Sequence, residues 1–137
     1  MTASHMRDTD GCIFVYDITD RQSYDHISDW MDTLQLTSGD DVIRYLVGNK
    51  LDLIKNQEST ALVGKSEAIN FCRLHNLDGV AECSALNNIN IDNMFMSMCT
   101  SLYKKNKQLL EERGKRKSEN IRNINIINNN QEKFCCI

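Results

Sequence analysis

Three short runs of mostly apolar residues constrain the fold of this chain more than any other feature. The runs are residues 12–16, 42–48 and the shorter 80–83, and the first of them is rich in β-branched and aromatic side chains. Runs of this kind are typical of strands that are buried on both faces. Segments with helical spacing lie between and after them. Strands that alternate with helices indicate a parallel sheet with right-handed crossovers, so the sequence predicts an α/β fold with three parallel strands and three helices.

We expect the helices over residues 22–35, 65–75 and 90–110, and a polar loop over residues 54–64. Apolar side chains recur every three or four residues in these helices, which gathers them on one face. The predicted inner faces are Tyr24, Ile27, Trp30, Met31 and Leu34 in the first helix, Ala68, Phe71 and Cys72 in the second, and Ile91, Met94, Phe95, Met98 and Leu102 in the third.

The composition is that of one ordinary globular domain, with 137 residues, 41% of them hydrophobic and 26% charged. No apolar run is long enough to predict a membrane span. The spacings of the six cysteines fit neither a zinc site nor a redox pair, which indicates reduced thiols in a cytoplasmic protein. The sequence therefore predicts no metal ligands.

The last third of the chain differs from the rest in charge and pattern. Residues 104–133 hold nine Lys or Arg and four Glu, a net charge of about +5, which leaves about −8 on the remainder. An acidic body argues against a nucleic-acid partner. The basic segment either meets an anionic membrane surface or simply keeps the chain soluble. Beyond residue 111 the helical pattern ends, so we predict a domain over residues 1–111 and a disordered, basic and asparagine-rich tail over residues 112–137.

Polar residues follow the second and third predicted strands. Asn49, Lys50 and Asp52 come directly after the second strand, and Ser84 and Ala85 follow the third. Because the carboxyl ends of parallel strands meet at one edge of a sheet, we expect these two loops to converge.

The chemistry of the first loop suits guanine. The carboxylate of Asp52 can accept from the two neighbouring N–H donors on the Watson–Crick edge of guanine, whereas adenine presents an acceptor there. The stem of Lys50 can lie along the flat base while its ammonium stays in water. Asn49 can donate and accept at once. The alternative interpretation is a plain polar turn after a strand, which a tetrapeptide alone does not exclude.

A motif for the phosphates of a nucleotide is absent from the sequence. The chain contains no Gly-x-x-x-x-Gly-Lys-Ser/Thr phosphate loop. The sequence therefore predicts a chain that can select a base but cannot hold its phosphates.

Four segments together resemble one known family in order and spacing. Residues 49–52, Asn-Lys-Leu-Asp, look like the Asn-Lys-x-Asp motif of Ras-superfamily small GTPases, and residues 82–86, Glu-Cys-Ser-Ala-Leu, look like the Glu-Thr-Ser-Ala-Lys motif. Residues 15–24 are similar to the fourth strand and third helix of the Rab family, and residues 135–137 resemble a Rab double-cysteine terminus. The chain thus resembles the C-terminal part of a Rab-type GTPase.

The resemblance implies a guanine site formed by Asn49, Lys50, Asp52, Ser84, Ala85 and Leu86. Asp52 would hold guanine N1–H and the exocyclic amine, Asn49 would contact the base edge and brace the loop, and Lys50 would stack over the base. Ser84 would orient Asp52, and the backbone N–H of Ala85 would donate to guanine O6. Leu86 stands where the family has a lysine, so the lysine stem that would lie over the base is lost.

The family's cofactors are GTP or GDP and Mg²⁺, but this sequence has no counterpart of the phosphate loop, the Mg²⁺-binding Thr or the catalytic Gln. The resemblance therefore implies a truncated Rab-type switch of vesicle traffic, without catalytic or metal-binding residues and inactive alone. The alternative is a non-enzymatic remnant or interaction module that binds no GTP usefully.

The resemblance also implies partners. Cys135 and Cys136 would carry prenyl groups after delivery by an escort protein, which would make the chain a peripheral protein on the cytosolic face of endomembranes. Two unmodified thiols are the alternative. Rab effectors are the expected protein partners, and the strand at residues 12–16 would expose an apolar edge that invites self-association.

Overall fold

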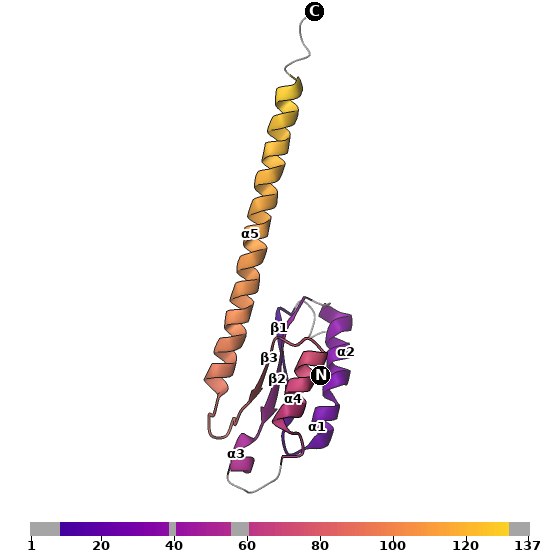
Figure 1. Cartoon of the computed structure of the whole chain (residues 1–137), viewed down its shortest axis with the longest axis vertical. Coiled ribbons are helices and arrows are strands. Elements are labelled where there is room, and N and C mark those ends of the chain that lie inside the picture. The colour runs from indigo at the N-terminus through magenta and orange to yellow at the C-terminus, as the bar shows by residue number, and fades with distance from the viewer. Residues whose placement is uncertain (1–8, 39–40, 56–60, 132–137) are drawn as a thin grey trace, which may run out of the picture. The chain divides into compact units, whose positions relative to one another are not determined.

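The computed structural model describes residues 9–38, 41–55 and 61–131, with the side chains of those up to residue 115. Figure 1 shows the chain, which divides into two compact units, residues 1–102 and 103–137. The elements are β1 (Gly11–Asp17), α1 (Arg21–Asp25), α2 (Ile27–Ser38), β2 (Ile43–Asn49), α3 (Leu51–Lys55), α4 (Lys65–Leu74), β3 (Gly79–Glu82) and α5 (Ile91–Gln131).

The three strands of the first unit form one parallel sheet in the order β1-β2-β3. Phe14 of β1 is level with Leu46 of β2, which is level with Val80 of β3. The predicted α/β class with three parallel strands is confirmed. Strand β2 is central, so four consecutive residues, 45–48, are buried. This is why its sequence shows an apolar run rather than an alternation.

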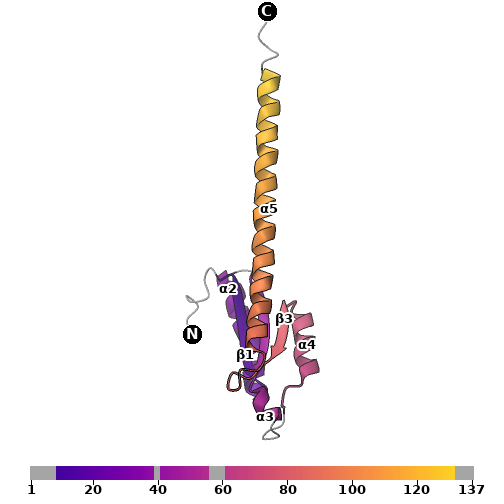
Figure 2. The same cartoon turned by 90° about the vertical axis from the view of Figure 1, so that its left-hand side faces the viewer.

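Helices cover both faces of the sheet. Figures 1 and 2 show α1, α2 and α4 on one face and the first turns of α5 on the other. The larger cluster of buried residues includes Phe14, Tyr16 and Leu46, and lies on the side of α1, α2 and α4. A smaller cluster on the α5 side joins Val47 to Met94. Because successive strand residues point to opposite faces, each strand contributes to both clusters.

The helices differ from the prediction in detail. The first predicted helix is divided at His26 into α1 and α2, and residues 51–55, partly predicted as loop, form the short helix α3. Trp30 and Phe95 are 40% and 50% exposed, so their assignment to inner faces is wrong. Each lies beside the buried stripe of its helix, and the apolar pattern alone does not give the width of the face that the sheet covers.

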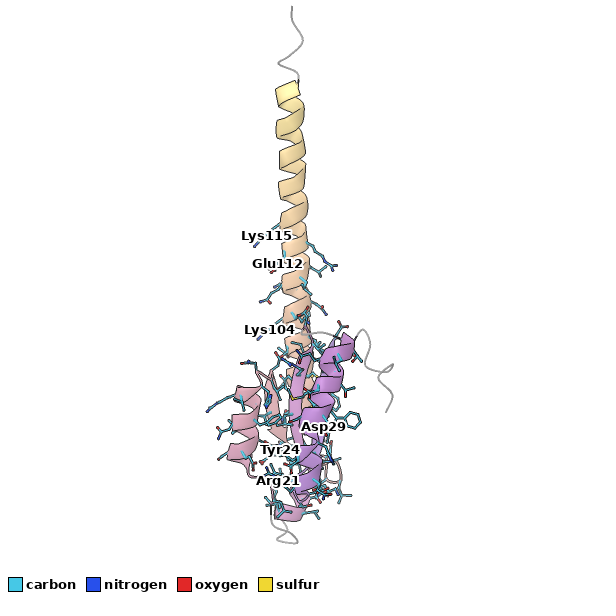
Figure 3. All side chains as sticks on the ribbon, turned by 90° about the vertical axis from the view of Figure 1, so that its right-hand side faces the viewer. Arg21, Tyr24, Asp29, Lys104, Glu112 and Lys115 are labelled. Carbon is cyan, nitrogen blue, oxygen red and sulfur yellow. The ribbon has the colours of Figure 1, made fainter. Side chains whose placement is uncertain are left out.

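Arg21 ties α1 to α4. Its guanidinium lies 2.6 Å from Glu67 of α4 and 2.9 Å from Asp25 of its own helix. The same group lies 5.2 Å from the centre of the Tyr24 ring, in the region labelled in Figure 3. The three charged side chains are exposed, so the ion pairs add little stability by themselves.

Helix α5 is much longer than predicted. The sequence predicts a disordered tail from residue 112, whereas α5 continues to Gln131 in the structure. The chain contains no proline, and residues 104–117 are mostly Lys, Glu, Leu, Gln and Arg, which favour a helix. Cys135 and Cys136 lie outside the described residues. None of the helices in the described residues could span a membrane.

Gly48 sits where β2 passes closest to the Tyr16 ring. A Cβ atom at this position would lie 2.8 Å from Tyr16 Oη and 3.0 Å from Tyr16 Cζ. The Tyr16 hydroxyl is buried without a hydrogen-bond partner among the described residues, and burial, followed by the charge of Glu82, raises the pKa of this phenol above its usual value. The absence of a side chain at Gly48 therefore leaves space for the buried Tyr16 ring.

We predict that Gly48→Ala lowers the free energy of unfolding by about 1–3 kcal/mol, because the added methyl overpacks the sheet against Tyr16. Urea unfolding followed by circular dichroism measures this change. Gly64→Ala is the matched control, since a Cβ there meets nothing within 4 Å. It should change stability by less than about 1 kcal/mol. Equal effects of the two substitutions would contradict the tight packing at Gly48.

Candidate functional site

The loops that follow β2 and β3 meet at the carboxyl edge of the sheet. The backbone N–H of Cys83 donates to Gly48 O at 2.8 Å, which extends the pairing of β2 and β3 by one step. The N–H of Leu51 then donates to Cys83 O at 3.0 Å. The chain segments that carry the predicted site residues are therefore linked by their own backbones.

Asp52 and Ser84 form the buried part of the site. Asp52 lies in the first turn of α3 and is only 6% exposed, and Ser84 is fully buried. The Ser84 hydroxyl donates a hydrogen bond to Asp52 Oδ1. Ser84 Oγ also accepts from the backbone N–H of Asn87 at 3.1 Å, so the hydroxyl is itself oriented. The carboxylate is thus held in one direction by the neighbouring loop.

Asn49 connects the same two loops nearer to the surface. Its side-chain Oδ1 accepts from the N–H of Ala85 at 3.0 Å and from the N–H of Lys50 at 2.8 Å. The resemblance assigns the Ala85 N–H to guanine O6, whereas here it donates to Asn49. Ala85 itself is exposed at this edge. The bracing role expected for Asn49 agrees with this geometry.

Lys50 adopts a left-handed backbone with φ of 67°, which is uncommon for a residue with a side chain. Its ammonium lies 2.6 Å from Asp17 Oδ2, at the end of β1. Sequence reasoning missed Asp17. The signal was available, since Asp17 ends the first strand at the edge where Asn49 ends the second, and the two residues are level in the sheet.

The pKa values of the Asp17–Lys50 pair reflect their contact. Burial raises the pKa of the Asp17 carboxyl, but hydrogen bonds from Lys50 and Thr19 outweigh it and hold the pKa below its ordinary value. The Asp17 carboxylate in turn raises the pKa of Lys50. Both groups are therefore charged at neutral pH.

The loop after β3 folds back on itself. The N–H of Ser84 donates to Ile89 O at 3.1 Å, and the N–H of Ile89 donates to Ser84 O at 2.9 Å. Asn88, with φ of 52°, supplies a positive backbone angle that asparagine tolerates better than most residues. The turn leaves Ala85 exposed and Leu86 82% exposed. Leu86 therefore lies in the loop at this edge with most of its side chain exposed to solvent.

Among the residues that the structure describes, no group of three or more His, Cys, Asp and Glu side chains could hold a metal ion. The cysteines of the first unit are free, and burial raises the pKa of Cys83, the one next to Ser84. The polar groups described at this edge are amide, hydroxyl and carboxylate groups and the Lys50 ammonium.

Comparison with known proteins gives the family. The Ras family model matches residues 1–104, about three quarters of the chain. The chain belongs to the Ras family. The predicted Rab-type, Ras-superfamily relationship is confirmed by its relatives. This chain is 35% identical over 104 residues to "Ras-related protein RGP1" of Oryza sativa subsp. japonica. The matched segment covers 76% of this chain and 44% of that protein.

Two further relatives support the same family assignment. Identity is 32% over 123 residues with "GTP-binding protein YPTM1" of Zea mays, covering 88% of this chain and 55% of that protein. It is 34% over 102 residues with "Ras-related protein Rab-13" of Canis lupus familiaris, covering 74% and 48%. The chain spans about half the length of the curated relatives it matches. The activity of a whole family member is therefore not carried over to this chain without further argument.

We predict that Ser84→Ala destabilises the fold by about 1–3 kcal/mol, because it removes the donor that holds the buried carboxylate of Asp52. Urea unfolding at neutral pH measures the loss. Ser97→Ala is the matched control: Ser97 is exposed on α5, and its hydroxyl donates to Asn93 O of the same helix. Its effect should stay within about 0.5 kcal/mol. A Ser84→Ala variant as stable as this control would show that the hydroxyl is not needed.

Proposed function

We propose that this Ras-family chain recognises the guanine base of a nucleotide through the six residues Asn49, Lys50, Asp52, Ser84, Ala85 and Leu86, here called the base rim. The observation that carries the proposal is the buried Asp52 carboxylate, oriented by Ser84 and joined to the Ala85 loop through Asn49. The Asp52 carboxylate, an acceptor, and the Ala85 N–H, a donor, belong to different loops and are thereby fixed on one edge of the sheet.

The chemistry favours guanine over adenine. The Asp52 carboxylate would accept from N1–H and the exocyclic amine of guanine, while the N–H of Ala85 would donate to O6. Adenine would place a ring acceptor against the carboxylate and an amine against the N–H. Both mismatches leave polar groups without partners, which is costly in a partly buried site. Lys50 would cover one face of the ring with its stem, and Leu86 would add only its exposed apolar surface.

The affinity of the base rim alone is expected to be low. Three or four charge-assisted hydrogen bonds would contribute about 1.5–3 kcal/mol each. Association costs about 4–15 kcal/mol in lost freedom, so the expected Kd is about millimolar or weaker. Tight binding of GTP would need groups that grip the phosphates, and the sequence contains no phosphate-loop motif.

The family implies GTP or GDP and Mg²⁺ as cofactors. The base rim fits the base of such a nucleotide, because its donors and acceptors match the Watson–Crick edge of guanine. In this family the metal would neutralise phosphate charge during phosphoryl transfer. The described residues include no acidic cluster for it. We therefore assign no catalytic residue and propose that this chain alone does not hydrolyse GTP.

At the level of the cell, we propose a Rab-type nucleotide switch in membrane traffic, with Rab effectors as partners. This proposal is supported by the family and by relatives such as "Ras-related protein Rab-13" of Canis lupus familiaris. Peripheral attachment to endomembranes through prenyl groups on Cys135 and Cys136, added with the escort protein, is part of the same proposal. Mass spectrometry of the native C-terminal peptide decides it, because unmodified cysteines would rule out the lipid anchor.

The base preference can be measured by titrating the ¹⁵N-labelled full chain with guanosine 5′-monophosphate and following the amide signals by NMR. We expect saturable shifts at Leu51, Asp52 and Ala85 with a Kd of about millimolar, and no saturable shift with adenosine 5′-monophosphate. Asp52→Asn should abolish the preference, whereas Asp29→Asn, on the exposed face of α2 in Figure 3, should keep it. Equal responses to both nucleotides would refute base recognition.

Calorimetry with GDP and Mg²⁺ tests the second half of the proposal. A Kd of about millimolar or weaker is expected for this chain. A micromolar value would mean that the chain holds phosphates by groups that we have not identified.

A second candidate function is an interaction module, and the observation that favours it is the outer edge of β1. Among the described strands only β2 pairs with β1, and Val15 is 56% exposed. Residues 11–16 contain no charged residue and no proline, the usual protection of an edge. We propose a second copy as the occupant, since antiparallel pairing about Phe14 would place Ile13 of each chain opposite Val15 of the other.

We predict that Val15→Lys shifts the chain toward monomer by disfavouring this pairing, as measured by sedimentation velocity over a range of concentrations. Leu36→Lys is the control, because Leu36 is also an exposed apolar residue but lies on α2. It should leave association unchanged. A wild-type chain that stays monomeric at all concentrations would remove this candidate.

A further inference from the structure

Asp17 lies beside the base rim but belongs to a third element. It is the last residue of β1 and is level with Asn49, the last residue of β2. The N–H of Ile18 donates to Asn49 O at 3.1 Å, which ties the ends of the two strands together. Asp17 is thus fixed next to the loop that starts at Lys50.

The Asp17 carboxylate is oriented independently of Lys50. Its Oδ1 accepts from the N–H of Thr19 at 2.8 Å and from Thr19 Oγ1 at 2.7 Å. The N–H of Asp17 donates to Ser23 Oγ at 2.9 Å. Oδ2 is the oxygen that meets the Lys50 ammonium at 2.6 Å. Asp17 Oδ1 is therefore held by the turn between β1 and α1, and Oδ2 contacts the Lys50 ammonium.

Lys50 is held at three points. Its N–H donates to Asn49 Oδ1 at 2.8 Å, its carbonyl accepts from the N–H of Leu53 at 3.1 Å, and its ammonium contacts Asp17. Its left-handed backbone costs free energy, and such a conformation persists where the surroundings fix it. A free lysine side chain also has considerable rotamer entropy, which contact with a fixed carboxylate reduces before any ligand arrives.

We propose that Asp17 is a positioning residue for base recognition, which holds the Lys50 stem in the orientation that covers the guanine ring. The inference rests on the proposed function. The tether fixes both ends of the stem, one at the loop after β2 and the other at the end of β1. A ligand that stacks on the stem then does not have to order it.

A role in stability alone is a weaker explanation of the pair. The Lys50 side chain is 55% exposed, and exposed ion pairs contribute little to folding. A structural ion pair also needs no left-handed residue at one of its ends. The two explanations differ in what they predict for a double substitution measured with a ligand.

The test compares Asp17→Asn, Lys50→Met and the double variant in the same guanosine 5′-monophosphate titration. The introduced asparagine can still accept from Thr19, and the introduced methionine keeps an apolar stem without the charge. We expect each single variant to weaken binding about two- to five-fold, and the double variant to be no weaker than either. Asp25→Asn is the control: Asp25 is also paired, but with Arg21 on α1, and its replacement should leave the Kd unchanged.

The outcomes separate this inference from the proposed function. If the wild type shows no guanine-selective binding, the base rim is wrong and the role of Asp17 falls with it. If the wild type binds but Asp17→Asn binds equally well, or if the losses add in the double variant, only the positioning role is overturned.

A ligand-free measurement covers the case in which Asp17→Asn does not fold. In Lys50→Met the pKa of the Asp17 carboxyl, followed by ¹³C NMR, should rise above its wild-type value because its charged partner is gone. An unchanged pKa would show that the two groups do not interact in solution, which would overturn the proposal.

Discussion

The hydrogen bond from the Ser84 hydroxyl to the Asp52 carboxylate is the contact on which the rest of the site depends. A carboxylate buried at the edge of a sheet is costly unless a donor meets it. Ser84 supplies that donor from a loop 32 residues further along the chain. The positions of the two loops are therefore coupled, because the buried Asp52 carboxylate and the buried Ser84 hydroxyl are hydrogen-bond partners.

The other contacts of the edge follow from this one. Asn49 accepts from the N–H of Ala85 in the loop that carries Ser84, and this loop is also held at the start of α3 by the N–H of Leu51, which donates to Cys83 O. Lys50, next in the chain, is thereby directed toward β1, where Asp17 meets it. The ends of all three strands thus contribute to one edge. We propose that the groups at this edge are the contacts for the guanine base.

Parts of this arrangement are readable from the sequence. Continuous apolar runs identify the strands, and the parallel sheet brings the loops at Asn49 and Ser84 together. The position of Asp17 at the end of the first strand is readable as well, but its contact with Lys50 depends on a side-chain rotamer and a left-handed backbone, which no pattern encodes. Engagement of the Ala85 N–H by Asn49 was equally hidden, because it needs the exact separation of two loops. The extension of α5 beyond residue 111 follows from helix propensity, which competes there with a polar, low-complexity composition.

Amide hydrogen exchange at Ala85 tests most directly whether the two loops are locked together without a nucleotide. Ala85 is exposed, so its N–H is protected only if it is bonded to Asn49. We predict exchange slower than in an unfolded peptide of the same sequence, and loss of this protection in Asn49→Ala while the N–H of Ile89 stays protected by Ser84 O. Exchange of Ala85 in the wild type at the rate of an unfolded chain would contradict the account.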